Sequence, residues 1–225
     1  MKALFIVFFL LNPLVNCFSQ SSIEDYRKCV SENFYVENFS ESIYYLNKII
    51  EINPKDSSAY NNRGFIKELI NDIPGAIEDY TIQISIDSTL ADSFFFRAMA
   101  KGKLLNFKGA IIDYQKTVLY EPNNADAYFF MGLAKFQLND VNGAILVYND
   151  AISLRNNKHE AYYNRALAYE KLNNNQAALS DYSKAIEIDA TIADYYLKRG
   201  QLKIKMHKKK SAKLDFDTYI TFPKP

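Results

Sequence analysis

The residues from Ala161 to Ala190, AYYNRALAYEKLNNNQAALSDYSKAIEIDA, contain the pattern on which the fold depends. Tyr162, Ala166 and Tyr169 share one face of a helix, since residues three or four positions apart lie on the same side of it. A second stripe with this spacing comprises Ala178, Tyr182, Ala185 and Ile186. Asparagines at 173 to 175 separate the stripes, because Asn side chains compete for backbone hydrogen bonds. The stretch therefore predicts two short amphipathic helices, and neither can bury its apolar face alone.

The same pattern returns every 34 residues without an insertion. Six repeats, numbered 1 to 6 below, begin at Ile23, Ser57, Ala91, Ala125, His159 and Ala193. Position 4 of each repeat is aromatic, and position 8 is Gly or Ala in all but repeat 1. Position 20 is Ala and position 24 is aromatic, again outside repeat 1. Small residues at positions 8 and 20 allow two helices to approach closely while rings fill the space beside them. Each repeat is expected to form a helical hairpin.

The glycines follow the same register. Gly64, Gly132 and Gly200 occupy position 8, and a further three occupy position 19, namely Gly75, Gly109 and Gly143. A glycine inside a helix costs about 1 kcal/mol relative to Ala. We therefore expect close helix packing to explain both sets.

A 34-residue helix-turn-helix repeat of this kind resembles the tetratricopeptide repeat (TPR) family. The resemblance covers residues 23–225. It implies an all-α fold, an α-solenoid in which six hairpins form a right-handed superhelix, with residues 20–225 as one solenoid domain. Lys213 replaces the apolar residue found at position 21 of the other repeats, so the last hairpin is expected to cap the array.

The first 19 residues differ from the repeats. Lys2 precedes an apolar run from Ala3 to Leu11, which is shorter than the roughly 20 residues needed to span a bilayer. This pattern is typical of a secretory signal peptide over residues 1–19, with cleavage after Ser19. Lipidation at Cys17 is the alternative, although Asn16 departs from the lipoprotein motif. We expect an exported protein of the bacterial periplasm or cell envelope.

Positions 7 and 23 are either both charged or both uncharged within a repeat. In four repeats position 7 is Arg and position 23 is Asp, whereas the other two repeats have Cys29 with Tyr45 and Met131 with Val147. We predict an ion pair joining the two helices of each charged hairpin; the alternative is a row of arginines lining a groove for anions. The predicted pairs are Arg63 with Asp79, Arg97 with Asp113, Arg165 with Asp181, and Arg199 with Asp215.

The resemblance also implies a binding surface. In this family, ligand contacts come mainly from positions 2, 5, 9, 12 and 13, on the concave face formed by the first helices. At these positions the chain presents an apolar concave strip of Phe65, Phe95, Met99, Phe129, Leu133, Phe136, Tyr163 and Leu167. If exposed, such a strip marks a protein-binding site; the alternative is that it packs between neighbouring first helices. The family's clamp for terminal carboxylates is not expected, since Ser31, Asp92 and Phe96 replace residues that it requires.

Two other surfaces could bind partners. Residues 198–213 contain eight Lys or Arg and no acidic residue, which suits an anionic membrane, nucleic acid or an acidic partner, or is simply a solvated helix end. Leu214, Ile220 and Phe222 could mediate oligomerisation through the terminal repeat, although we expect a monomer.

Signals for catalysis are weak. The two histidines, His159 and His207, lack metal-ligand spacing, and neither a phosphate-binding loop nor a nucleophile motif is visible. We therefore expect no enzyme activity, no cofactor, no metal and no nucleic-acid binding. The sequence predicts a scaffold that binds another protein or peptide segment.

Overall fold

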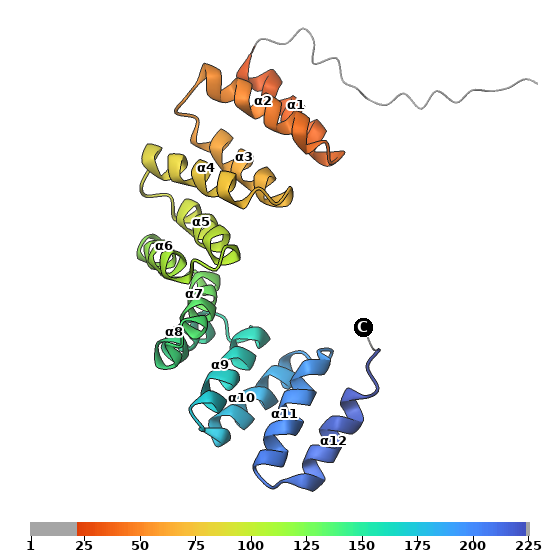
Figure 1. The fold of residues 1–225 in the computed structure, drawn as a ribbon. Helices are drawn as coiled ribbons and strands as arrows, with labels where there is room; N and C mark the ends of the chain where they lie inside the picture. Colours follow the sequence, from red (N-terminus) through yellow and green to blue (C-terminus); the bar gives the residue numbers. More distant parts are fainter. Residues whose placement is uncertain (1–21, 224–225) are drawn as a thin grey trace, which may run out of the picture. The chain divides into compact units, whose positions relative to one another are not determined.

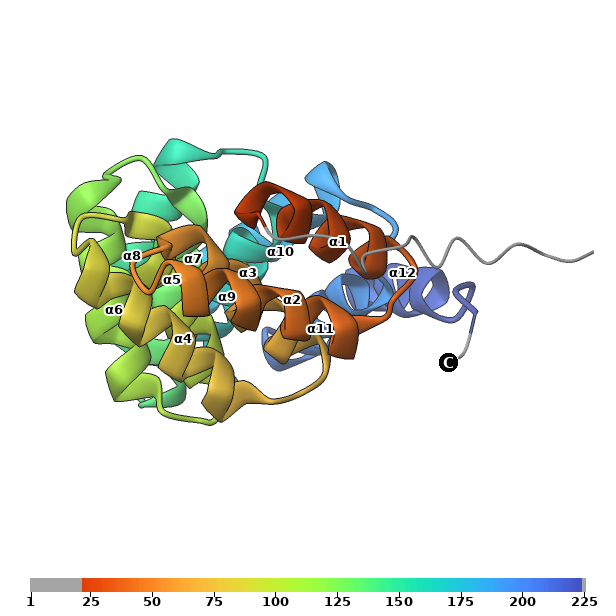
Figure 2. The ribbon, with the colours of Figure 1, turned by 90° about the horizontal axis from the view of Figure 1, so that it is seen from above.

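The computed structural model describes residues 22–223, and within that range it contains twelve helices and no strand (Figures 1 and 2). The helices pair into six hairpins, one for each repeat, and every first helix begins at the first residue of its repeat. Their bounds are α1 Ile23–Tyr35, α2 Phe39–Ile52, α3 Ser57–Leu69, α4 Ile73–Ile86, α5 Ala91–Lys103, α6 Phe107–Tyr120, α7 Ala125–Gln137, α8 Val141–Leu154, α9 His159–Lys171, α10 Asn175–Ile188, α11 Ala193–Lys205 and α12 Lys209–Tyr219. The fold is an all-α solenoid of helical hairpins. The predicted signal peptide over residues 1–19 and the alternative site at Cys17 lie outside the described residues.

Every first helix ends in the same turn, with position 15 in the left-handed region. These residues are Glu37, Asn71, Leu105, Asn139, Asn173 and His207, with φ between 57 and 65°. In repeat 2, the amide of Asn71 donates to the carbonyl of Glu68 and the amide of Asp72 donates to that of Lys67. This pair of bonds is the Schellman motif, which satisfies the last carbonyls of a helix. Asn adopts this conformation readily, whereas Leu105 is strained by it.

The second helices begin with side-chain caps that account for one set of glycines. Asp72, Asn106, Asp140 and Asn174 each accept a hydrogen bond from the backbone amide three residues later. In three repeats that residue is the position 19 glycine. A Cβ at Gly75 would lie 2.2 Å from the Asp72 carboxylate. The nearest atoms to the position 19 glycines thus belong to the cap side chains and not to the partner helix, which differs from the expectation of helix packing, although repeat 5 forms the same cap with Ala177.

The position 8 glycines do serve packing, but against a ring. A Cβ at Gly132 would lie 2.3 Å from Cε1 of Tyr148, and Gly64 and Gly200 face the rings of Tyr80 and Phe216 in the same way. Positions 8 and 20 also meet, since Ser42 Oγ donates to the carbonyl of Val30 at 3.2 Å. In the three repeats with glycine at position 8, a ring of the second helix thus lies across that glycine.

The chain divides into two compact units at residue 87. The N-terminal unit contains α1 to α4, and the C-terminal unit, residues 88–223 of the described range, contains α5 to α12. Each hairpin of a solenoid contacts only its neighbours, so such an array can be divided at a repeat boundary. The expectation of one solenoid domain over 20–225 stays a prediction.

The C-terminal repeat ends the described chain with a shorter helix, α12. Ala212 is buried at position 20, while Lys213 is exposed at position 21. Leu214 and Ile220 are 67% and 69% exposed, but the ring of Phe222 packs on that of Tyr196 with centroids 5.8 Å apart. The longest described helices have 14 residues, and none of the described helices is long and apolar enough to cross a bilayer.

Candidate functional site

Four repeats contain an arginine–aspartate pair that joins the two helices of the hairpin. In each, the arginine Nε and Nη2 donate to the two carboxylate oxygens at 2.6 to 3.1 Å. This parallel double hydrogen bond is the strongest geometry available to an arginine and a carboxylate. The pairs are those predicted from the sequence: Arg63 with Asp79, Arg97 with Asp113, Arg165 with Asp181, and Arg199 with Asp215.

Further contacts fix each guanidinium in place. Nη1 of Arg165 donates to Asn149 in the preceding repeat at 2.7 Å, and Arg63 reaches Asn47 in the same way at 2.6 Å. In three repeats a lysine at position 11 also approaches the aspartate, as Lys101 does to Asp113 at 2.7 Å. Burial opposes the charge on Arg165, but its hydrogen bonds and charge interaction with Asp181 outweigh burial and raise its pKa. Because their donors are occupied, these arginines do not form a row for anions.

The predicted apolar strip does not form one open surface. Phe129 is only 6% exposed, and its ring packs on Tyr148 and lies under the ammonium of Lys158 at 4.6 Å. Phe65, at 44%, is the one exposed residue among the eight and lies in the N-terminal unit. The other six are half-buried: Phe95, Met99, Leu133, Phe136, Tyr163 and Leu167. Phe129 is therefore a core residue, and much of the strip packs between helices.

The N-terminal unit has an apolar groove between α1 and α3. Its cavity of about 250 Å³ is lined by Val30, Ser31, Phe34, Tyr35, Asn62, Phe65 and Ile66. The rings of Phe34 and Phe65 lie 6.1 Å apart, and Tyr35 is 85% exposed beside them. Phe34 and Tyr35 are absent from the predicted strip because repeat 1 departs from the common pattern. Their positions, 12 and 13, were a signal for them, since both are ligand-contact positions.

The C-terminal unit has a second groove, formed by α7, α9 and α11. An open cavity of about 300 Å³ is lined by Phe136, Leu167, Glu170, Lys171, Lys198 and Gln201. Phe136 and Leu167 belong to the predicted strip, and Lys171 lies over the Phe136 ring at 5.0 Å. Neither Lys171 nor Lys198 has a carboxylate within 4 Å in the described range. This groove thus combines apolar side chains with two unpaired ammonium groups.

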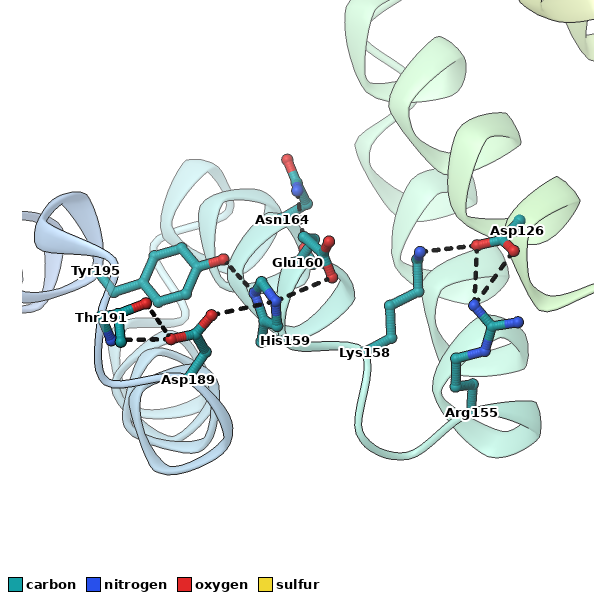
Figure 3. Close-up of polar contacts among 9 residues, drawn as sticks. All are labelled: Asp126, Arg155, Lys158, His159, Glu160, Asn164, Asp189, Thr191 and Tyr195. Carbon is teal, nitrogen blue, oxygen red and sulfur yellow. Dashed lines mark hydrogen bonds and ion pairs between the residues drawn. The ribbon is translucent and has the colours of Figure 1, made fainter.

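Asp126, at the start of α7, is bound by the turn between repeats 4 and 5. Figure 3 shows Lys158 and Arg155 pointing at Asp126, with Lys158 Nζ 2.8 Å and Arg155 Nη1 3.2 Å from its carboxylate. Burial alone would raise the pKa of Asp126, but the bonds and charges of Lys158 and Arg155 outweigh burial and lower it. This carboxylate is therefore a structural anion and not a poised acid.

His159 lies in a second polar cluster at the next turn (Figure 3). Its Nδ1 is 2.7 Å from the hydroxyl of Tyr195, and its Nε2 is 3.6 Å from Asp189 and 3.7 Å from Glu160. Burial and the nearby carboxylates raise the pKa of Tyr195 to about 12. Tyr163 also donates from its hydroxyl to Asp194. The described residues contain no group of His, Cys, Asp and Glu that could hold a metal ion.

Two models of the tetratricopeptide repeat match the chain, one over residues 132–173 and one over residues 159–191. A comparison with curated protein sequences finds no match.

Solved structures share the fold at low sequence identity. A tetratricopeptide repeat protein from Parabacteroides merdae has a TM-score of 0.78 and 17% identity, covering 90% of this chain and 80% of that chain. A MamA protein has a TM-score of 0.71 and 23% identity over 77% of this chain and 94% of that chain. YrrB, a TPR protein described as having an unusual peptide-binding site, has a TM-score of 0.67 and 21% identity, covering 78% and 91%.

Proposed function

We propose that this chain, in which residues 132–191 match models of the tetratricopeptide repeat, is a non-enzymatic scaffold that holds a segment of another protein in the grooves of its first helices. TPR proteins generally mediate protein–protein interactions, and the solved relative YrrB has a peptide-binding site. The observation that carries the proposal is the groove between α1 and α3, where aromatic rings remain open to solvent. Isolated soluble proteins rarely leave such rings uncovered without a partner.

The chemistry of the groove defines what it binds. The Phe34 and Phe65 rings offer an apolar surface, while Ser31 and Asn62 offer hydrogen bonds at its rim. A bound segment would bury an apolar side chain over these rings, which is the usual source of affinity in such clefts. Its backbone would pair with the rim. Phe129 takes no part, because it is buried.

The test is site-specific photo-crosslinking in cells. A benzoyl-phenylalanine at Tyr35 should capture the partner, and one at Leu167 tests whether the second groove contacts the same protein. Tyr44, an exposed ring on α2 outside the groove, is the matched control. The captured protein is then purified, and we expect Phe65→Ser to weaken its binding about tenfold or more, while Tyr44→Ser leaves it unchanged. Equal capture from Tyr35 and Tyr44 would contradict groove binding.

A second candidate function is assembly through the terminal repeat. Leu214 and Ile220 are highly exposed on and just after α12, and no described residue covers them. Burying both between copies would favour a dimer. Sedimentation velocity at micromolar concentration distinguishes the two functions: a monomer favours the scaffold, and a dimer that Leu214→Ser with Ile220→Ser disrupts favours assembly.

We also propose export to the bacterial cell envelope, with residues 1–19 acting as a signal peptide. The support is the Lys2-led apolar run, which is too short to span a bilayer. The intact mass of the protein recovered from cells tests this proposal. A chain beginning at Gln20 supports cleavage after Ser19, a lipid-modified chain beginning at Cys17 supports the lipoprotein alternative, and an unprocessed chain contradicts both.

A further inference from the structure

In the C-terminal unit, the turns inside the hairpins lie along one edge and the turns between repeats lie along the other. Successive helices alternate in direction, so all turns of one kind fall on the same side. Lys205 Nζ donates to Asn173 at 3.1 Å, which joins the turns of repeats 5 and 6 directly. On the other side, Lys158 and Asp126 join the turns that precede repeats 4 and 5. We call the first edge, residues 103–108, 137–142, 171–176 and 205–210, the lysine edge.

The two edges differ in charge. The lysine edge has Asp140 as its one acid, and that carboxylate is bound by Lys135 at 2.8 Å. The basic residues of this edge are Lys103, Lys108, Lys171, Lys205, Lys208, Lys209 and Lys210. The opposite edge, residues 121–126, 155–160 and 189–194, is acidic on balance. Like charges gathered on one edge repel one another, and an anionic partner relieves that repulsion.

The lysine edge also exposes leucines at its turn tips. Leu104, Leu105, Leu138 and Leu172 are all exposed, and Leu105 is 73% exposed. Leu105 has φ 59°, a conformation that strains leucine, while the corresponding residues of repeats 4 and 5 are Asn139 and Asn173. The backbone of Leu105 takes part in the turn, but its side chain is mostly exposed to solvent. Its position among lysines indicates a surface that meets both negative charge and an apolar phase.

We propose that the lysine edge binds the surface of an anionic phospholipid bilayer. The lysines would lie against the phosphate groups, and the leucines would enter the boundary between headgroups and acyl chains. A bilayer offers both features in one plane, which suits a row of protruding turn tips. A protein partner would need a matching row of apolar pockets between acidic groups.

Vesicle co-sedimentation tests the proposal with the chain beginning at Gln20, which retains every described residue. The wild-type chain should bind vesicles of phosphatidylcholine with 30% phosphatidylglycerol and not vesicles of phosphatidylcholine alone. The double variant Lys208→Gln, Lys209→Gln should bind about 25-fold more weakly, at about fivefold per lysine. The matched double variant Lys116→Gln, Lys184→Gln removes the same charge from outside the edge and should bind as the wild type does.

Leu105→Asn separates a membrane role from a structural one. Asn suits the left-handed turn, so the variant should be at least as stable as the wild type in a thermal melt. It should nevertheless bind the anionic vesicles roughly tenfold more weakly, because an apolar side chain is lost from the boundary. Equal binding to both vesicle types, no binding to either, or equal weakening by the two lysine double variants would overturn the proposal.

Discussion

Repeats 4 and 5 are neighbouring helical hairpins, but the side chains that join their two helices differ: repeat 5 uses an ion pair and repeat 4 an apolar pair. Repeat 5 joins its helices with Arg165 and Asp181, and the Tyr182 hydroxyl donates to Glu170 at 3.0 Å. Repeat 4 places Met131 and Val147 at the positions of that ion pair, and they pack in an apolar cluster. At the position of Glu170 it has Phe136, and the buried hydroxyl of Tyr148 has no partner in the described range.

The difference shows that the hairpin does not require its ion pair. In repeat 4 an apolar pair joins the two equivalent helices. This is expected if desolvation offsets much of the Coulomb attraction between buried charges. The ion pair instead adds directional contacts, since Arg165 also reaches Asn149 of repeat 4. Four predictions test this comparison, from the largest expected effect to the smallest.

The first prediction converts repeat 5 to the chemistry of repeat 4. Arg165→Met alone leaves the Asp181 carboxylate buried without its partner, so we expect the free energy of unfolding to fall by about 3–5 kcal/mol. The double variant Arg165→Met, Asp181→Val should recover to within about 1 kcal/mol of the wild type, because no unpaired charge remains. Urea denaturation followed by circular dichroism measures both. A double variant as unstable as the single one would show that repeat 5 depends on its ion pair.

The second prediction gives repeat 4 the small residue of repeat 5, which has Ala166 at position 8. Gly132→Ala places a methyl group 2.3 Å from the Tyr148 ring, so the ring must move. We expect a loss of about 1–3 kcal/mol, the usual cost of overpacking. Gly102→Ala is the control, since nothing lies within 4 Å of a Cβ there, and it should stabilise the chain by up to about 1 kcal/mol. Thermal melts that rank the two variants in the opposite order would contradict the packing argument.

The third prediction concerns the tyrosine hydroxyls. Burial, followed by the charge and hydrogen bond of Glu170, raises the pKa of Tyr182, whereas burial alone raises that of Tyr148. Tyr182→Phe removes a hydrogen bond to a carboxylate and should cost about 1 kcal/mol. Tyr148→Phe removes an unpaired buried hydroxyl and should be neutral or slightly stabilising. If both changes cost the same in urea denaturation, Tyr148 has a partner such as a buried water.

The fourth prediction uses the lowered pKa of Asp126 at the start of repeat 4. A carboxyl group with a lowered pKa in the folded state stabilises fully above its ordinary pKa of 3.8, and that contribution is lost as the pH falls through the lower folded value. As the pH falls below about 4, the free energy of unfolding of Asp126→Asn should therefore decrease less than that of the wild type. The difference should stay under about 1 kcal/mol, because the pair is partly exposed and solvent screens it. Asp150→Asn, an exposed change in the same repeat, should follow the wild type in melts at each pH.

Sequence alone determined the features that depend on residues within one hairpin. The 34-residue period placed the start of every first helix, and the joint presence of Arg and Asp at positions 7 and 23 identified the four ion pairs. These predictions succeed because helical periodicity and the contacts inside a hairpin repeat with the chain. The glycines at position 19 show the limit of such reasoning, since their role depends on a cap side chain three residues earlier.

Tertiary structure decided which side chains remain open to a partner. Phe129 and Phe65 both belong to the concave strip predicted from the sequence. In the structure Phe129 is buried, whereas Phe65 lines a groove. Tyr35 lines a groove because α1 lies beside α3, and the sequence pattern of repeat 1 alone does not indicate this. The lysine edge likewise arises because stacking brings distant turns together, as the contact between Lys205 and Asn173 shows. The exposure of a side chain and the net charge of an edge depend on residues in neighbouring repeats. The sequence pattern within one repeat therefore does not predict either.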